Sequence, residues 1–456
     1  MSENHNHDLP QTPQGAAKQP GETSTVWLIW LIYGVFYFCR TNLSVAVPGM
    51  QMSVEDGGLA LDKQQIGLIL GSLKLSYAFG QLLNGQLSEK ISPRVLLALG
   101  LLGSAGLNVL FGFATGLYFL IFVWACNGYC QSLGWTPCVR VLGNWVPILR
   151  RGKAIGIVGT GYQVTLGLSY IVAGAAIEHY GNWRGAVFYP AGILAASAVI
   201  MLLFLRESPR EGVEEGDSSP SPTKQPAGVK RSFAENLTLT ISNSALWRLG
   251  IALALLNACR YGFLDWGITH LLEMQKEITG TQGGAGGLSK ATLKYAVIAV
   301  GAVAGSYLSG WATDRFFGGR RAPGISCLLV ALAGLTILYE YVTSTQFEYR
   351  VQCTMGLLII IGFCIYGPQV LLVGTAPADL AKQGTAAAAA GLGNFMGYLG
   401  AFGGDTVTGW TAKHLGWQVA LYFWAGWALL AAVVSATLWH AGGDKRQGPE
   451  IEEPKA

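Results

Sequence analysis

The chain has 456 residues, of which 51% are hydrophobic and only 12% are charged, and its formal net charge is +4. Soluble globular proteins carry about 25% charged residues, so this composition excludes an ordinary water-soluble protein and favours a chain that lies in a lipid bilayer. The 62 glycines fit helices that pack closely in a membrane, where small residues let two backbones approach each other.

Apolar stretches of about 20 residues, the length of helix that crosses a bilayer, recur along the chain. They predict an all-α membrane protein with twelve transmembrane helices, near residues 26–47, 65–87, 95–114, 117–141, 152–177, 184–206, 244–270, 291–312, 323–343, 351–374, 384–410 and 417–440. The polar residues 1–25 predict a disordered N-terminal tail, and residues 441–456 are expected to form a second tail.

One connection between the predicted helices is long and polar. Residues 207–243 contain "REGVEEGDSSPSPTKQPAGVKR", and this Ser, Pro, Gly and charged composition is typical of a linker. The linker divides the chain into two predicted six-helix halves, residues 26–206 and 244–440. Lysines and arginines cluster in the linker and in the loops on the same side of the predicted membrane, so we expect the linker and both termini to be cytoplasmic.

Two six-helix halves predict an internal repeat, and the loops after the second and eighth spans show one. They read "GQLSEKISPR" (85–94) and "GWATDRFFGGRR" (310–321). We expect the first glycine of each loop to allow close packing and the charges to gather at the cytoplasmic end. An ordinary basic loop is the alternative, above all for the first copy, where Ser88 stands in place of an acid. The candidate loop residues are Gly85, Arg94, Gly310, Asp314, Arg315 and Arg321.

Arg40 in the first span and Arg260 in the seventh occupy equivalent places in the two halves. An arginine in mid-bilayer costs about 2.5–3.5 kcal/mol or more, and two at one depth also repel each other. A shared anion near the midplane, where transporters built from repeats bind substrate, would explain both, because the planar guanidinium donates paired hydrogen bonds to phosphate or carboxylate. The alternative is a structural carboxylate for each arginine. Asp265 is a candidate for Arg260, although it is poorly placed on the same helix face.

Tyrosines accompany the arginines. Tyr33 and Tyr37 precede Arg40 by seven and three residues, so the three side chains share one face of the first span. Tyr77 in the second span and Tyr366 in the tenth are similar amphipathic donors. A single tyrosine in a membrane span is more often a packing residue than a ligand, but the stripe that contains Arg40 favours an anion site.

Lys74 and Gln81 both lie in the second span. They are seven residues apart, nearly two helical turns, so they face the same way roughly 10 Å apart. Lys74 either lines a pathway or extends to the membrane interface.

No motif of catalysis or metal binding is found. The eight cysteines fall in apolar stretches without CxxC spacing, and we interpret them as small buried hydrophobic residues. There is no nucleophile–base pair, metal cluster or phosphate-binding loop. We therefore expect no enzymatic activity, no metal or other cofactor and no nucleic-acid partner.

Twelve spans in two halves, together with "GWATDRFFGGRR", resemble the major facilitator superfamily and its fold. More narrowly, the chain resembles the organophosphate:phosphate antiporters, among which the glycerol-3-phosphate and hexose-phosphate transporters look closest. This resemblance extends from the first span to the twelfth, and its segments are "YGVFYFCRTNLSVAVPGM" (33–50), "NGYCQSLGWTPCVRVLGNW" (127–145), "RYGFLDW" (260–266) and "GFCIYGPQVLL" (362–372).

The resemblance implies exchange of inorganic phosphate for a phosphorylated metabolite by alternating access, in a bacterial inner membrane, with Arg40 and Arg260 as the phosphate-binding pair. It further implies pocket positions at Tyr33, Tyr37, Tyr77, Trp135, Tyr366 and Tyr398. We add Lys74, Gln81, Tyr162 and Asp265 as candidate residues of the same site. The implied partners are the phosphorylated substrate, inorganic phosphate and the bilayer, and we expect a monomer.

The chain departs from the family pattern where substrate selectivity would be set. Tyr162 stands where many members carry a histidine, and Gln81 stands where the glycerol-3-phosphate type has a lysine. Ala390 and Gly393 replace an aspartate and a lysine of the hexose-phosphate type. The organic substrate is therefore open, and Lys74 is a candidate replacement for the missing lysine.

Two other functions remain open at this stage. A membrane receptor with the same fold would bind a sugar phosphate and signal instead of transporting it. A proton-coupled carrier of another organic anion would take up substrate without counter-phosphate, driven by a pH gradient.

Overall fold

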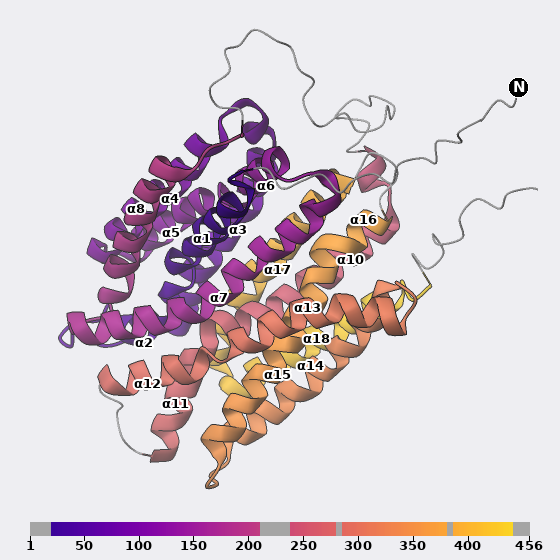
Figure 1. Ribbon diagram of the computed structural model, residues 1–456. Helices are drawn as coiled ribbons and strands as arrows, with labels where there is room; N and C mark the ends of the chain where they lie inside the picture. The colour runs from indigo at the N-terminus through magenta and orange to yellow at the C-terminus, as the bar shows by residue number, and fades with distance from the viewer. Residues whose placement is uncertain (1–19, 210–237, 280–284, 381–385, 441–456) are drawn as a thin grey trace, which may run out of the picture.

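The computed structural model describes residues 20–209, 238–279, 285–380 and 386–440, and within these ranges the regular secondary structure is all helical. Figure 1 shows two groups of helices, an N-terminal group in indigo to magenta and a C-terminal group in pink to yellow. The all-α fold is thereby confirmed. Residues 1–19, 210–237 and 441–456, which contain most of the predicted tails and linker, lie outside the described residues.

The N-terminal group consists of eight α-helices and one 3₁₀ turn. They are α1 (Glu22–Val35), η1 (Phe36–Cys39), α2 (Asn42–Met50), α3 (Lys63–Lys90), α4 (Pro93–Phe113), α5 (Leu117–Ser132), α6 (Trp135–Trp145), α7 (Ile148–Tyr180) and α8 (Gly185–Phe204).

The C-terminal group contains two π-helical turns, η2 and η3, among its α-helices. Its elements are α10 (Ser244–Tyr261), η2 (Gly262–Trp266), α11 (Gly267–Thr279), α12 (Ala285–Tyr295), α13 (Ile298–Phe316), α14 (Arg321–Ser344), α15 (Arg350–Val370), η3 (Leu371–Thr375), α16 (Ala376–Leu380), α17 (Ala386–His414) and α18 (Trp417–Ala436).

Every predicted span falls on helix, but the ends and continuity differ. The first helix begins at Glu22, inside the predicted tail, and the predicted fourth span is interrupted between α5 and α6. Nine helical segments of the described ranges are long and apolar enough to cross a membrane. The count of twelve stays a prediction.

Local sequence signals account for several helix ends. Asp62 and Gln65 form a capping box at the start of α3, in which each side chain bonds the other residue's main-chain N–H at 2.9 and 3.0 Å. The Ser92 side chain caps α4, and Pro93 occupies its first turn. Gly181 ends α7 in the left-handed conformation with φ 75°.

The two halves pack against each other where α3 meets α17 and where α7 meets α12 and α13. A Cβ on Gly67 would lie 2.7 Å from the Asp405 main-chain oxygen, and a Cβ on Gly174 would lie 2.3 Å from Thr292 Oγ1. Glycine fits both positions because any larger residue would collide with the backbone of the facing half at Gly67 and with the Thr292 side chain at Gly174.

Two ion pairs join the halves where α3 begins and α17 ends, which we call the Asp62 end. Lys413 Nζ lies 2.9 Å from Asp62 Oδ2, and Lys63 Nζ lies 2.7 Å from Glu273 Oε2. Towards the opposite end of α7 there is open space beside the helix, because Cβ atoms on Gly152 and Gly156 would meet no atom within 4 Å.

The space around Gly310 differs from the sequence prediction that this glycine allows close packing. A Cβ on Gly310 would also meet no atom within 4 Å, so the expectation that Gly310 allows close packing is wrong for this conformation. Two of the eight cysteines, Cys327 and Cys353, are exposed on their helices rather than buried.

Candidate functional site

Arg40 follows the 3₁₀ turn η1, which interrupts the first helix between α1 and α2. Its side chain is buried, with the residue only 3% exposed. Its Nε donates to Gln131 Oε1 at 3.1 Å, and Nη2 donates to the main-chain oxygen of Gln131 at 3.4 Å. Nη1 is buried without a hydrogen-bond partner among the described residues. The guanidinium is therefore anchored on one edge and has an unused donor.

Neutral polar side chains hold Gln131 in turn. Gln131 Nε2 donates to Ser104 Oγ at 2.7 Å, and Ser104 Oγ donates to Asn127 Oδ1 at 2.6 Å. Asn127 Nδ2 donates to the main-chain oxygen of Cys39 at 2.9 Å, which ties the network back to η1. No member of this network is charged except Arg40, so the arginine is positioned without being neutralised.

Arg260 lies in the last turn of α10, directly before the π turn η2. It is 2% exposed. Its Nη2 donates to the Tyr366 hydroxyl at 3.3 Å, and Nη1 contacts Asn257 Oδ1 at 3.5 Å. Nε has no partner within the described ranges. Both arginines thus lie beside a departure from α-helical geometry, which is frequent at functional sites.

Aromatic rings cover both guanidinium groups. The Arg40 guanidinium carbon lies 4.6 Å from the ring centroids of both Tyr37 and Tyr77. The Arg260 carbon lies 4.8 Å from those of both Tyr261 and Tyr366. Such cation–π contacts stabilise a buried cation without removing its charge.

Two rows of tyrosine rings connect the arginines across the interface of the halves. In the first row, Tyr162 stacks on Tyr37 at 5.1 Å and lies 6.2 Å from Tyr366. In the second row, Tyr398 lies 4.2 Å from Tyr77 and 6.3 Å from Tyr261. The rows place both arginines and the predicted tyrosines around one region.

The remaining predicted aromatic and amide residues border this region. Trp135 packs on Tyr33 with ring centroids 4.8 Å apart. Gln81 Nε2 donates to the Ser132 main-chain oxygen at 3.3 Å. Trp135, Tyr162, Tyr398 and Gln81 are partly exposed, whereas the arginines are buried.

The electrostatics of this region favour an anion. Among the described residues, no ion pair involves Arg40 or Arg260. Two buried cations therefore face a region lined by tyrosine hydroxyls, with unpaired donors on each guanidinium. This arrangement suits a compact, multiply charged anion that accepts several hydrogen bonds.

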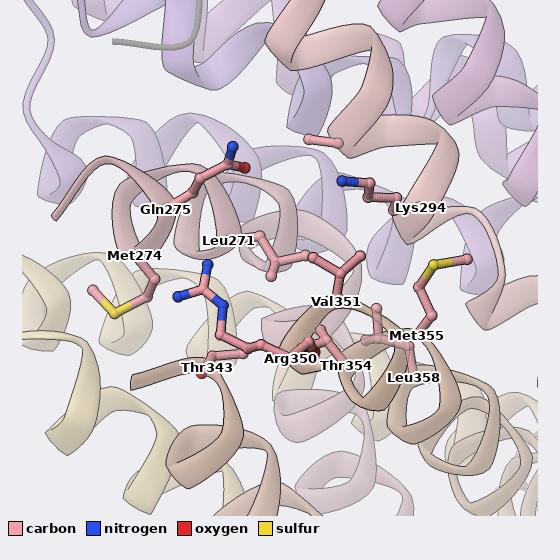
Figure 2. A pocket seen from close by; sticks show the side chains of 11 residues that line it. Leu271, Met274, Gln275, Lys294, Thr343, Arg350, Val351, Thr354, Met355 and Leu358 are labelled. Carbon is pink, nitrogen blue, oxygen red and sulfur yellow. The ribbon is translucent and has the colours of Figure 1, made fainter. Parts of the chain in front are cut away.

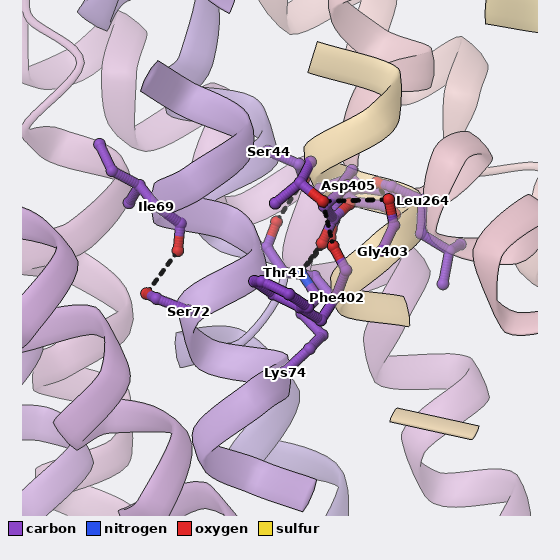
Figure 3. A network of polar contacts seen from close by, with 12 residues as sticks. Thr41, Ser44, Ile69, Ser72, Lys74, Leu264, Phe402, Gly403 and Asp405 are labelled. Atoms are coloured by element: carbon purple, nitrogen blue, oxygen red, sulfur yellow. Dashed lines mark hydrogen bonds and ion pairs between the residues drawn. The ribbon is translucent and has the colours of Figure 1, made fainter. Parts of the chain in front are cut away.

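Lys74 and Asp265 behave differently from their predicted roles. Lys74 does not extend to the membrane interface, because it is 1% exposed and its ammonium contacts the carboxyl groups of both Asp265 and Asp405, the latter at 2.9 Å. Figure 3 shows Lys74 and Asp405 turned toward each other between the halves. Asp265 pairs with Lys74 and not with Arg260, so the structural-carboxylate alternative for Arg260 is not what the structure shows.

The loop motif is partly assembled. In its second copy, Arg321 Nη1 donates to Asp314 Oδ1 at 2.8 Å and to Thr313 Oγ1 at 2.7 Å, while Arg315 is exposed. In the first copy, Arg94 donates through its main chain to Glu207 at 3.1 Å and through its side chain to the Leu202 oxygen at the end of α8. The surroundings of Gly85 lie outside the described residues.

Sequence reasoning missed three residues that contact the predicted ones: Gln131, Asp405 and Tyr261. Asp405 had the same signal as Arg40, a charge inside an apolar span. Gln131 lies in the segment 127–145 that carried the family resemblance, and Tyr261 directly follows Arg260.

Figure 2 shows a pocket that is separate from this site. It has a volume of about 500 Å³, including space open to solvent, and is lined by residues of α11, α12, α14 and α15, among them Lys294 and Arg350. None of the predicted site residues lines it.

Comparisons with known proteins bear on the family of the chain. Residues 29–405 match the sequence profile of the Major Facilitator Superfamily. The glycerol-3-phosphate transporter of Bacillus subtilis is 29% identical over 433 residues, which cover 91% of this chain and 91% of that protein. The membrane sensor protein UhpC of Escherichia coli is 29% identical over 421 residues, which cover 90% of this chain and 89% of that protein.

A solved structure supports the fold. The crystal structure of a bacterial homolog to the human lysosomal transporter Spinster, inward-facing and unoccupied, matches with a TM-score of 0.75 and covers 95% of this chain and 100% of that chain. Its sequence identity is 17%, so this likeness bears on the fold alone.

Proposed function

The chain belongs to the major facilitator superfamily, and we propose that it is a secondary transporter that exchanges a phosphorylated organic metabolite for inorganic phosphate by alternating access. The Bacillus subtilis relative, which aligns with about nine-tenths of this chain, is a glycerol-3-phosphate transporter. In the proposed cycle, the two halves move about a central site and open it to one side of the membrane at a time.

The observation that carries the proposal is the pair formed by Arg40 and Arg260. They come from equivalent helices of the two halves, both are buried, and neither is in an ion pair among the described residues. Each keeps a guanidinium nitrogen without a partner. A phosphate group bound between them would neutralise both charges and accept from both free donors, which removes the cost of keeping two cations in the bilayer.

The proposed orientation makes the Asp62 end extracytoplasmic and the termini cytoplasmic. The basic loops of 85–94 and 310–321 lie at the other end, as expected for the cytoplasmic side. The halves are joined by ion pairs and close glycine contacts at the Asp62 end. This conformation would therefore be closed to the outside, with the site reached from the cytoplasm.

The organic end of the substrate would meet the partly exposed residues that border the arginines. Tyr162 offers one neutral hydroxyl where many family members carry a histidine, and Gln81 offers a neutral amide where a lysine is common. Lys74 is engaged by two carboxyl groups and does not replace that lysine in this conformation. A substrate with one phosphate group and a neutral, hydroxyl-bearing remainder fits this set.

The test is counterflow in proteoliposomes that contain the purified protein. Liposomes loaded with inorganic phosphate should take up labelled phosphate, and a panel of unlabelled phosphorylated and carboxylated metabolites should reveal the organic substrate by competition. Uptake that needs no internal phosphate but follows a pH gradient would instead identify a proton-coupled carrier.

A sensor of phosphorylated sugars is the second candidate, because UhpC is as similar to this chain as the transporter is. Such a protein would bind phosphorylated ligand without carrying it. Saturable phosphate binding combined with an absence of counterflow in the same preparation would favour the sensor.

A further inference from the structure

Lys74, Asp265 and Asp405 form a buried cluster that the proposed phosphate site does not use. We call these three residues the triad. Lys74 belongs to α3 of the N-terminal half, whereas Asp265 in η2 and Asp405 in α17 belong to the C-terminal half. The side chains are 0–2% exposed. The triad is therefore sealed from water and spans the interface between the halves.

The charges of the triad do not balance if every group is ionised. One ammonium would face two carboxylates, which leaves one buried negative charge. Both carboxyl groups contact the same ammonium, so two like charges would also lie close to each other. A buried charge without compensation is costly, and a group in that situation usually takes up or loses a proton.

Hydrogen-bond geometry distinguishes the two carboxyl groups of the triad. Asp265 accepts a hydrogen bond from Lys74. Asp405 approaches Lys74 at 2.9 Å, but both of its carboxyl oxygens lack a hydrogen-bond donor in good geometry among the described residues. Asp405 is thus the less stabilised carboxylate, and a proton on it removes the net charge of the triad.

Among the described residues, no group on the neighbouring helices forms a further ion pair with the triad. The Tyr261 ring of α10 lies 4.9 Å from Lys74 Nζ. The hydroxyls of Tyr170 in α7 and Tyr295 in α12 donate to main-chain oxygens of η2 at 2.8 and 2.6 Å. Arg260 is the nearest further cation along the chain, and its guanidinium lies against Tyr261 and a tyrosine of α15 instead.

The neighbours on α2 and α5 are uncharged. Thr41 and Ser44 of the first helix bond main-chain oxygens of their own helix, and Ser72 Oγ donates to the Ile121 oxygen of α5 at 3.2 Å. Lys74 is therefore the single cation that forms an ion pair with these two carboxyl groups among the described residues, whereas Arg40 and Arg260 lie against tyrosine rings.

We propose that the triad is a proton-binding site that takes up one proton when the two halves close at the Asp62 end and releases it when they open there. In the closed form, Lys74 pairs with Asp265 while Asp405 carries the proton. Opening separates Lys74 from both aspartates and exposes all three groups to water, where an aspartic acid ionises at neutral pH. The proton on Asp405 then passes to bulk water and no covalent bond other than its O–H breaks.

This site rests on the proposed alternating access, and it makes the conformational balance depend on the pH at the Asp62 end. If closing binds one proton, the ratio of open to closed molecules rises tenfold for each unit of pH increase, as long as the closed form keeps the proton. Because the triad is buried in the closed form, the proton returns to the side from which it came and is not carried across.

The experiment measures distances between spin labels on full-length protein in lipid nanodiscs. Labels at Val54→Cys and Phe347→Cys lie in loops of opposite halves, in a background where the exposed Cys327 and Cys353 are replaced by serine. When the pH is raised from 5.5 to 7.5, the ratio of open to closed molecules should rise by about 100-fold in protein with the wild-type triad, which is tenfold for each pH unit.

Two variants test whether the triad is the source of this dependence. Asp405→Asn and Asp265→Asn each leave one cation and one carboxylate, so each should reduce the change over the same range to less than twofold. Asp62→Asn is the matched control, because Asp62 also joins the halves at this end but is exposed to water, and it should keep the wild-type slope. Either aspartate variant suffices if the other fails to fold.

A distance distribution that does not change with pH in the wild-type background would overturn the proton site, and so would an unchanged slope in a folded aspartate variant. Failure of phosphate counterflow would instead refute the transport proposal, because the spin-label measurement requires no phosphate. The two failures are therefore distinguishable.

Discussion

Gln131 offers the sharpest prediction about how Arg40 is held. Replacing Gln131 by leucine removes the acceptor of the 3.1 Å bond from Arg40 Nε and leaves only the 3.4 Å contact with the main chain of residue 131. A hydrogen bond to a charged group contributes about 1.5–3 kcal/mol. We expect Gln131→Leu to lower the free energy of unfolding by about this amount.

The same loss should weaken phosphate binding. Without Gln131, a smaller fraction of molecules holds Arg40 in the orientation that binds phosphate, and the apparent phosphate affinity falls in proportion to that fraction. A loss of about 1.5 kcal/mol, the lower limit, corresponds to about tenfold weaker binding. Thermal unfolding followed by tryptophan fluorescence reports the first quantity, and binding of labelled phosphate to nanodisc-embedded protein reports the second.

Two further substitutions separate geometry from charge. Gln131→Glu keeps an acceptor beside Arg40 but neutralises it, so stability should be retained while phosphate affinity falls more than in Gln131→Leu. Asn108→Leu is the matched control, because Asn108 Nδ2 donates to the main-chain oxygen of Ser104 at 2.9 Å, next to the same buried network, and none of its side-chain hydrogen bonds among the described residues involves Arg40. It should destabilise without changing phosphate affinity. Normal phosphate affinity in Gln131→Glu would refute the claim that Arg40 must stay un-neutralised.

Three more predictions concern selectivity and the closed end. Tyr162→His should change the preference among organic phosphates more than the affinity for inorganic phosphate, measured by competition in counterflow; an equal loss for all substrates would make Tyr162 structural. Gly174→Val should prevent closure at the Asp62 end, because a Cβ there meets Thr292 Oγ1 at 2.3 Å, and spin-label distances across that end should lengthen. Burial raises the pKa of Asp62, but hydrogen bonds from the α3 amides and Lys413 outweigh it, so the pKa lies below its ordinary value. These hydrogen bonds to ionised Asp62 therefore stabilise the folded protein fully above the pKa that Asp62 has in the unfolded chain. The stabilisation is lost as the pH falls through the lower pKa that Asp62 has in the folded protein. Since the pair is exposed, Asp62→Asn should cost roughly 0–1 kcal/mol at pH 7 and nothing in strong acid, as judged from thermal unfolding at both pH values.

The all-α architecture and the arginine pair could be predicted because their signals are local. Apolar runs of membrane-spanning length and a charge inside such a run are visible in short windows of the sequence. The repeat of the two halves then related Arg40 to Arg260 without any knowledge of distances.

The partners of those cations could not be predicted, because they come from distant parts of the chain. Gln131 lies 91 residues from Arg40, and Asp265 lies 191 residues from Lys74. Which side chains meet across helices depends on helix rotation, and η1 and η2 change that rotation beside both arginines. The alternative in which Lys74 extends to the membrane interface treated its helix as isolated, whereas two carboxyl groups of the opposite half hold Lys74 in the interior.

The packing of Gly310 could not be inferred either, because it depends on conformation. A glycine at a helix–helix turn indicates that a close approach is possible in some state. The structure has the halves in contact at the Asp62 end, whereas a Cβ on Gly310 would meet no atom within 4 Å. The close approach that this glycine permits is therefore not made in the conformation described.

The most direct test of the central claim is exchange of labelled inorganic phosphate by proteoliposomes that contain Arg40→Lys or Arg260→Lys. Lysine keeps the charge but lacks the planar fork that donates paired hydrogen bonds. The account predicts that each variant inserts and unfolds at a temperature close to that of the wild type, yet exchanges no phosphate. Near-normal exchange in either variant would contradict a phosphate site built by both arginines.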